Sequence, residues 1–173
     1  MDIKNIREFE QIFGKIIAHI IDDISNEILA VLKHSIDLNT YEYEHGDPYN
    51  YQYAKFNRSD WTGKNKKRTA LPTFEFREAF MVDTIKNTIS SHINEIFYNW
   101  RSMSIDKDMG IHYDMVKGDI REALATMLNI DGELGGKARQ PYFDITMTWI
   151  DANWDRLISK YFRKYGITHY KTQ

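Results

Sequence analysis

Cysteine is absent from this chain of 173 residues. Disulfide bonds, zinc sites with thiolate ligands and cysteine nucleophiles are therefore excluded. The absence fits a reducing compartment, and it equally fits a component of a particle that is assembled in a cytoplasm.

The sequence motifs of common enzyme classes are also missing. No Gly-x-Ser-x-Gly elbow occurs, and Gly135-Gly136 is not followed by the Gly-Lys-Ser/Thr of a phosphate-binding loop. The six histidines show neither the HExxH nor the HxH spacing of metal sites. We therefore expect a protein that is not an enzyme and that carries no metal and no cofactor.

His112 and Asp114 support an alternative hypothesis, a hydrolytic or toxin-type enzyme. Their side chains share one face of a short predicted strand, and general acid–base chemistry would also require a pocket beside them. A plain surface pair is the simpler interpretation. Two carboxylate pairs are weak candidates for a metal site, one on the solvated face of a predicted helix and one in a predicted turn: Asp22-Asp23 and Asp106/Asp108.

Long apolar runs and a strong net charge are missing as well. No stretch approaches the roughly 20 residues that a helix needs to span a bilayer, and the first residues lack the pattern of a signal peptide. The net charge is −2, whereas proteins that bind nucleic acid non-specifically usually carry a basic excess. We expect a soluble, non-secreted chain with no membrane contact.

What the chain does contain is an ordinary globular composition with many aromatic residues. Tyrosine occurs eleven times and tryptophan four times. Both side chains combine apolar area with a polar group, so they suit surfaces that are wet in one state and buried in another. The length fits a single domain over residues 1–173.

Two long amphipathic helices are the clearest predicted elements, over 6–36 and 141–165. The first has an apolar stripe of Phe9, Phe13, Ile16, Ile17, Ile20, Ile24, Ile28, Val31 and Leu32. The second has a stripe of Phe143, Thr146, Trp149, Ile150, Trp154, Leu157, Ile158, Tyr161 and Tyr165. Pro141 suits its first turn, and Gly166 suits its C-terminal cap with Ile167 as the accompanying contact. The surplus of aromatic residues indicates a second contact surface and hence oligomerisation.

The middle of the chain predicts strands. Tyrosines alternate over 40–53 around the turn His45-Gly46-Asp47-Pro48, which indicates a β-hairpin with one aromatic face. Over 73–105 the helix and strand patterns compete, and we favour a short helix near 74–82 followed by strands, the last over 96–105. Asp119 is a plausible N-cap of a further helix. The fold class is therefore α+β: a small antiparallel sheet with a tyrosine-rich hairpin, packed by a long N-terminal helix and a C-terminal amphipathic helix.

Residues 57–72 predict an exposed, mobile loop. Within it, residues 58–68 contain five basic residues and one tryptophan: Arg58, Trp61, Lys64, Lys66, Lys67 and Arg68. These side chains could bind nucleic acid through phosphate contacts and stacking on Trp61, so an alternative function is a small nucleic-acid-binding accessory protein. A solvated loop, or a loop that becomes ordered against an acidic protein partner, are the other interpretations.

The segment before the last helix carries the most specific pattern. After Gly135-Gly136 comes Ala138-Arg139-Gln140-Pro141-Tyr142-Phe143, an Ala-Arg-x-Pro-aromatic motif. Together with the long first helix, the β-rich middle and the final amphipathic helix, this motif resembles the tail-completion and neck (head–tail connector) proteins of tailed bacteriophages. In that family an Ala-Arg-Pro-Phe type motif precedes the last helix.

The resemblance implies a structural virion protein without catalysis. Such proteins form rings between the DNA-filled head and the tail, where they contact copies of themselves, the portal or connector, and the tail tube. It implies assembly in the host cytoplasm, a final location in the neck or tail of the virion, and passing contact with genomic DNA. We expect partner contacts from the basic residues and Trp61 of section 58–68, from Arg139 and from Tyr142.

Overall fold

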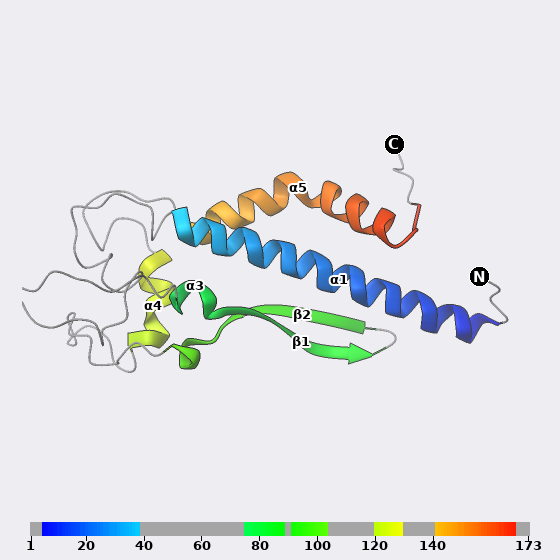
Figure 1. Cartoon of the computed structure of the whole chain (residues 1–173), viewed down its shortest axis with the longest axis horizontal. Coiled ribbons are helices and arrows are strands. Elements are labelled where there is room, and N and C mark those ends of the chain that lie inside the picture. Colours follow the sequence, from blue (N-terminus) through cyan, green and yellow to red (C-terminus); the bar gives the residue numbers. More distant parts are fainter. Residues whose placement is uncertain (1–4, 39–74, 89–90, 104–119, 130–140, 169–173) are drawn as a thin grey trace, which may run out of the picture. The chain divides into compact units, whose positions relative to one another are not determined.

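The structure, a computed structural model, describes residues 5–38, 75–88, 91–103, 120–129 and 141–168. Its elements are α1 (Ile6–Ile36), α3 (Glu75–Glu78), β1 (Phe80–Thr88), β2 (Ser91–Tyr98), the 3-10 helix η3 (Trp100–Ser102), α4 (Ile120–Asn129) and α5 (Tyr142–Lys164) (Figure 1). The two strands form an antiparallel sheet that packs with α1 and α5. The predicted α+β class, with a small sheet and two long helices, is therefore confirmed. The tyrosine-rich hairpin over 40–53 lies outside the described residues.

The chain divides into two compact units. Unit 1 contains α1 up to Ala30, the sheet from Val82 to Phe97, and α5 from Thr148 onward. Unit 2 contains the end of α1, α3, η3, α4 and the first turns of α5. Since α1, both strands and α5 each contribute residues to both units, the single domain over 1–173 stays a prediction.

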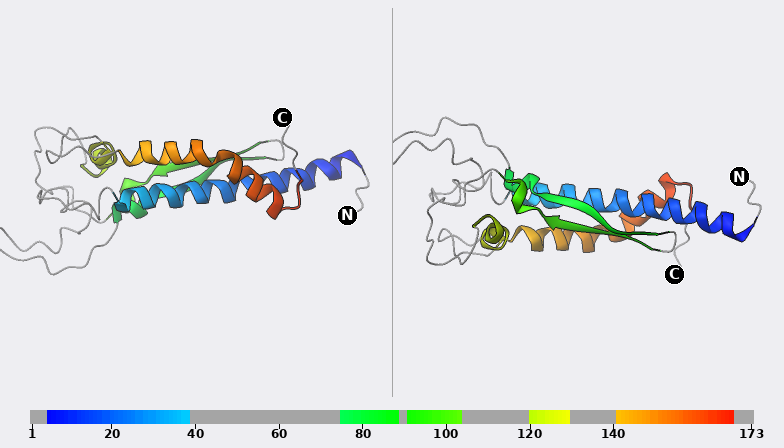
Figure 2. Two further views of the ribbon diagram at one scale, coloured as in Figure 1. Left: turned by 90° about the horizontal axis from the view of Figure 1, so that it is seen from above. Right: turned by 90° about the horizontal axis from the view of Figure 1, so that it is seen from below.

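The core of unit 1 lies between α1 and α5. Its buried side chains are Ile20, Leu157 and Tyr161, and Leu157 is fully inaccessible to water. Half-buried side chains pack around these three: Ile16, Ile17, Ile24, Ile28, Trp149, Phe162, Tyr165 and Ile167. The members from α1 recur every three or four residues, so the periodicity that predicts this helix also forms its buried face. Within this unit the two helices lie side by side (Figure 2).

Two carboxylates of α1 also join it to α5. Tyr161 Oη donates a hydrogen bond to Glu27 Oε2 at 2.6 Å, and Lys164 Nζ donates to Asp23 Oδ2 at 2.6 Å. Burial alone would raise the pKa of Glu27, but hydrogen bonds from Lys160 and Tyr161 outweigh it and hold that pKa below its ordinary value. Because the lysine side chains are half exposed, water screens both ion pairs, and apolar packing dominates this interface.

The ends of α5 follow the sequence prediction. Pro141 directly precedes the helix, and its carbonyl oxygen accepts the first helical hydrogen bond from Ile145 N at 3.1 Å. Gly166 has a φ of 73°, and Ile167 N donates to the Phe162 carbonyl oxygen at 2.8 Å. These are the features of a Schellman cap, in which glycine avoids the strain that a side chain meets at positive φ. Ile167 also packs on the core of unit 1, as predicted.

The predicted apolar stripe of α5 is wrong at two positions, because the side chains of Phe143 and Trp154 are exposed. The shielded face runs instead through Tyr142, Thr146, Trp149, Asn153, Leu157 and Tyr161. Phe143 and Trp154 each follow one of these positions by one residue, which turns them about 100° away around the helix. An apolar residue next to the buried face is thus easily assigned to it from spacing alone.

Unit 2 has an aromatic core of its own. Phe76, Phe80, Tyr98 and Tyr142 lie with ring centroids between 5.0 and 6.2 Å apart, mostly edge to face. Other buried apolar residues of this unit are Leu32, Ile36, Ala79 and Met103. The Tyr98 hydroxyl donates to the Arg121 carbonyl oxygen at 2.6 Å, which fixes the start of α4 to the end of β2.

The order predicted over 73–105, a short helix followed by strands, is confirmed by α3, β1 and β2. The helix predicted to reach 82 ends at Glu78, however, because β1 already begins at Phe80. The strand predicted over 96–105 is wrong from Asn99 to Met103, because η3 begins at Trp100, and its last two residues lie outside the described part of the chain. Asn99 N donates to the Ala79 carbonyl oxygen at 2.7 Å, and Met103 N then donates to the Trp100 carbonyl oxygen at 3.2 Å. The resulting turn leaves Met103 buried, a tertiary effect that alternation cannot reveal.

We predict that acid destabilises the α1–α5 contact partly through Glu27. Its pKa in the folded chain lies below the ordinary value of 4.5, so the unfolded chain binds this proton more readily. The stabilisation is therefore present above about pH 4.5 and is lost as the pH falls through the folded pKa. Urea unfolding between pH 7 and pH 3 should show a smaller loss of unfolding free energy for Glu27→Gln than for the natural chain.

Tyr161→Phe removes one of the hydrogen bonds to Glu27 and should give an intermediate pH dependence. Identical pH curves for the natural chain and Glu27→Gln would contradict this assignment.

Candidate functional site

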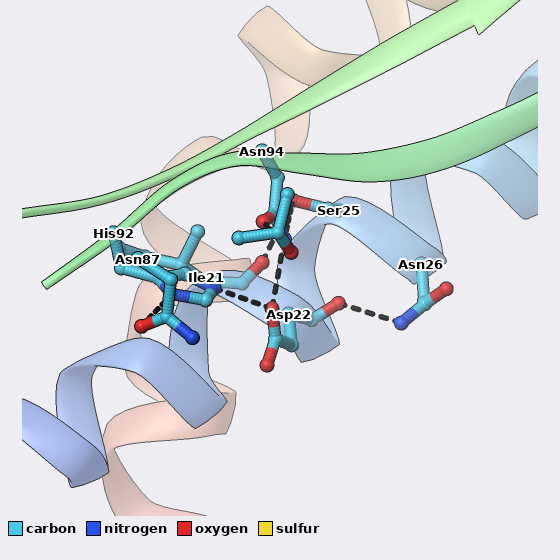
Figure 3. A network of polar contacts seen from close by, with 8 residues as sticks. Ile21, Asp22, Ser25, Asn26, Asn87, His92 and Asn94 are labelled. Carbon is cyan, nitrogen blue, oxygen red and sulfur yellow. Dashed lines mark hydrogen bonds and ion pairs between the residues drawn. The ribbon is translucent and has the colours of Figure 1, made fainter.

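A network of polar side chains joins α1 to β2 within unit 1 (Figure 3). His92 Nε2 lies 2.7 Å from Asp22 Oδ1, and Asn94 Nδ2 donates to the same oxygen at 2.9 Å and to Ser25 Oγ at 3.2 Å. His92 and Asn94 are two residues apart on a strand, so they share one face of the sheet. Asp22 and Ser25 are three residues apart on a helix and likewise share one face.

The His92 ring is held on both sides. Its side chain is only 6% exposed, and Nδ1 lies 3.3 Å from Asn87 Oδ1 while Nε2 contacts Asp22. Both ring nitrogens therefore face an oxygen, and neither is left to take a proton from a substrate in this arrangement. The network is suited to fixing the sheet on α1 rather than to acid–base catalysis.

Asp22 and Asp23 do not form the solvated pair that the sequence indicates. Asp22 faces the sheet, whereas Asp23 accepts hydrogen bonds from Lys164 and Tyr165 of α5. Consecutive residues of a helix point about 100° apart, so each carboxylate meets a different neighbour. Burial would raise the pKa of Asp22, but hydrogen bonds from Asn94 and His92 and the charge on the imidazoles lower it overall.

Beside this network an open apolar pocket of about 490 Å³ separates the first turns of α1 from the Thr88 and Ser91 ends of the strands. Its lining consists of Phe9, Glu10, Phe13, Gly14, Ile17, Thr88, Ser91 and His92. The volume lies within the range of ligand sites. All of these residues belong to unit 1.

A second, polar pocket of about 440 Å³ adjoins the first. It is lined by Gln11, Gly14, Lys15, Ala18, His19, Asp22, Asn87, Thr88 and His92. Gly14, Thr88 and His92 line both pockets, so the two form one groove, which we call the α1–sheet groove. One end of the groove is apolar and the other end is polar.

The aromatic side chains at the apolar end are open to water. Phe9 is 45% exposed and Phe13 is 41% exposed, and their rings stack with centroids 5.5 Å apart. Both belong to the predicted apolar stripe of α1, but that stripe continues past the residues that pack on the core of unit 1, of which Ile16 is the first. The stripe is thus longer than the surface that covers it.

The outer face of the sheet also exposes apolar side chains. His92 and Asn94 of β2 face α1, and Thr84 shares their face because its Oγ1 donates to Asn94 Oδ1 at 3.0 Å. Alternation along a strand then places Ile85 and Ile93 on the opposite face, and both are exposed. Unit 1 therefore presents apolar surface in two places, the groove and this outer face.

Most residues predicted to contact partners lie outside the described residues: Arg58, Trp61, Lys64, Lys66, Lys67, Arg68 and Arg139. His112 and Asp114 also lie outside them. Tyr142 is described and lies in the core of unit 2, where it is 2% exposed and its hydroxyl donates to the Ala125 carbonyl oxygen at 2.6 Å. Burial raises the pKa of this hydroxyl. Tyr142 is thus a core residue, and in this chain its side chain is not available to a partner.

Two further properties concern only the part of the chain that the structure describes. There, no group of three His, Asp or Glu side chains is placed to hold a metal ion. None of the helices described is both long and apolar enough to cross a membrane.

Comparisons of this chain with protein-family models, with curated protein sequences and with solved structures find no match. The candidate site combines a polar network that fixes the sheet on α1 with an adjoining groove and exposed aromatic rings.

We predict that Asp22→Ala lowers the free energy of unfolding by about 1–3 kcal/mol, because it leaves His92 and Asn94 without their shared acceptor. Chemical denaturation of the full chain measures this. Asn26→Ala is the matched control, since Asn26 lies one turn away and, among the described residues, its exposed side chain bonds only to the Asp22 carbonyl oxygen. That change should stay within about 0.5 kcal/mol of the natural chain. Equal losses for both variants would show that the network does not stabilise the fold.

Proposed function

We propose that this chain is a structural assembly protein, and that its place is the head–tail junction of a tailed bacteriophage. There it forms a ring of identical subunits that joins the portal or connector to the tail. Its partners are further copies of itself and neighbouring neck, portal or tail tube proteins, with passing contact to the genomic DNA. It is assembled in the host cytoplasm and carries out no catalysis.

The observation that carries the assembly role is the exposed aromatic pair beside the α1–sheet groove. Phe9 and Phe13 lie side by side and stay partly open to water, and Ile6, one turn before Phe9, is the most exposed of these three. Contiguous exposed apolar surface of this kind marks contact sites between proteins, because its burial on association is favourable.

The polar network supports a binding role over a catalytic one. A histidine paired with an aspartate resembles part of a catalytic triad, but His92 contacts Asn87 at its second nitrogen. The Thr88 hydroxyl donates to the Ser91 carbonyl oxygen at 3.1 Å and lies 3.0 Å from the Ser91 hydroxyl, so these two side chains fix the strand ends to one another. Thr88, Ser91 and His92 also line the groove, so hydrogen bonds hold part of its wall in place, which favours a preformed docking surface.

The location at the phage neck rests on the resemblance of the Ala138 to Phe143 motif and of the order of elements. Two expectations that the resemblance shares with the sequence, the long first helix and the amphipathic last helix, are present as α1 and α5. A ring requires a head-to-tail interface that closes on itself. The exposed Ile85 and Ile93 on the outer face of the sheet provide an apolar surface for such an interface.

We predict that deleting the gene for this chain from its phage yields separate filled heads and tails, visible by negative-stain microscopy, and that a plasmid copy restores joined particles. A plasmid copy with Phe13→Ser should fold normally, since Phe13 is exposed, but should restore few joined particles. Lys86→Gln is the control, because this exposed residue of β1 lines neither pocket.

Joined, infectious particles after the deletion would overturn the proposed function. Full restoration by Phe13→Ser would leave the phage role intact and would move the contact surface away from the groove.

A further inference from the structure

We infer that the α1–sheet groove receives a short peptide segment of a partner protein, in which an aromatic or aliphatic side chain is followed within about three residues by a carboxylate. This inference rests on the proposed function as an assembly protein and names the chemistry of the partner. The side chain occupies the apolar end of the groove, and the carboxylate lies at the polar end.

The apolar end suits an aromatic or aliphatic anchor. Phe9, Phe13 and Ile17 form its α1 side at helical spacing, and Phe9 and Phe13 already stack on each other. A third apolar side chain placed against them would remove their exposed ring surface from water, which is the main source of affinity in such contacts.

The polar end suits an anion because of Lys15. Lys15, Gln11 and His19 are four residues apart in turn, so they share one face of α1 and present an ammonium, an amide and an imidazole to the pocket. In the part of the chain that the structure describes, the exposed Lys15 side chain makes no ion pair or hydrogen bond. Its ammonium group can therefore pair with a carboxylate of a partner.

The carboxylate of Asp22, which also lines this pocket, already has partners. Its Oδ1 accepts from Asn94 and contacts His92, and among the described residues its carboxylate makes no ion pair with Lys15. The remaining acidic residue of the groove, Glu10, lies at the apolar end. A single carboxylate at the polar end is not repelled by Glu10, whereas the continuous phosphates of a nucleic acid would also lie close to Glu10 and be repelled by it. The charge pattern therefore favours a peptide.

Gly14 keeps the middle of the groove open. It lines both pockets from the interior of α1, where glycine is less favourable than alanine by about 1 kcal/mol. A residue without a side chain at this position lets another backbone approach the helix closely. The midpoints of Phe9/Phe13 and of Lys15/His19 are about six residues, or roughly 9 Å, apart along α1. An extended peptide covers that distance in about three residues.

The test uses the full chain labelled with ¹⁵N and the peptide acetyl-Trp-Gly-Gly-Asp-amide, with acetyl-Trp-Gly-Gly-Asn-amide as its uncharged match. Amide chemical shifts report which residues each peptide contacts. We expect shifts at Phe13, Gly14 and Lys15, and about fivefold tighter binding of the Asp peptide. Lys15→Gln should abolish that difference, whereas Lys86→Gln should leave it unchanged. Gly14→Leu should prevent binding of both peptides.

No shift in the groove at about 10 mM of either peptide, a range set by weak binding, would overturn the inference. So would equal binding of the Asp and Asn peptides, or stronger shifts in the groove from a single-stranded DNA oligonucleotide. Failure here is distinguishable from failure of the proposed function, because the gene deletion reads out head–tail joining without any assumption about the groove.

Discussion

The burial of one face of α1 is the constraint on which the rest of the structure depends. In unit 1 that face meets Leu157 and Tyr161 of α5 through Ile20, and in unit 2 the same helix contributes the buried Leu32 and Ile36. Each fully buried aliphatic side chain contributes about 1.5–3 kcal/mol, more than an ion pair that water screens. Apolar packing therefore determines which side of α1 faces α5. The carboxylates of Asp23 and Glu27 beside this face add hydrogen bonds to α5.

The same constraint explains why a surface is left open. The apolar stripe of α1 extends to Phe9 and Phe13, beyond the residues that pack on α5. The network of Asp22, His92 and Asn94 fixes the sheet against the helix, and a groove remains beside it. When the apolar stripe of a helix is longer than the part that packs in the protein core, the remaining apolar surface is available for association. This surplus connects the fold to the proposed assembly role.

The sequence predicts the parts of this protein that depend on local periodicity. The two long helices and the Gly166 cap follow from residues that are close in the chain, and so does the short helix before β1. The pairing of Asp22 with His92 joins positions 70 residues apart, and no local pattern encodes it. Residue spacing also does not reveal which side chains other elements of the fold cover. Tyr142, predicted to contact a partner, is therefore found buried, and Phe13, predicted to lie on the packed stripe of the first helix, is found exposed.

Thiol labelling can show directly whether the open end of the α1 stripe becomes buried on assembly, because the natural chain has no cysteine and each introduced thiol is unique. We expect Phe13→Cys to react with a maleimide about as fast as the exposed Asp151→Cys in the free chain, and much more slowly in the assembled particle. The buried Ser35→Cys should be protected in both states. Protection of Phe13→Cys in the free chain, or equal reactivity of Phe13→Cys before and after assembly, would contradict the account.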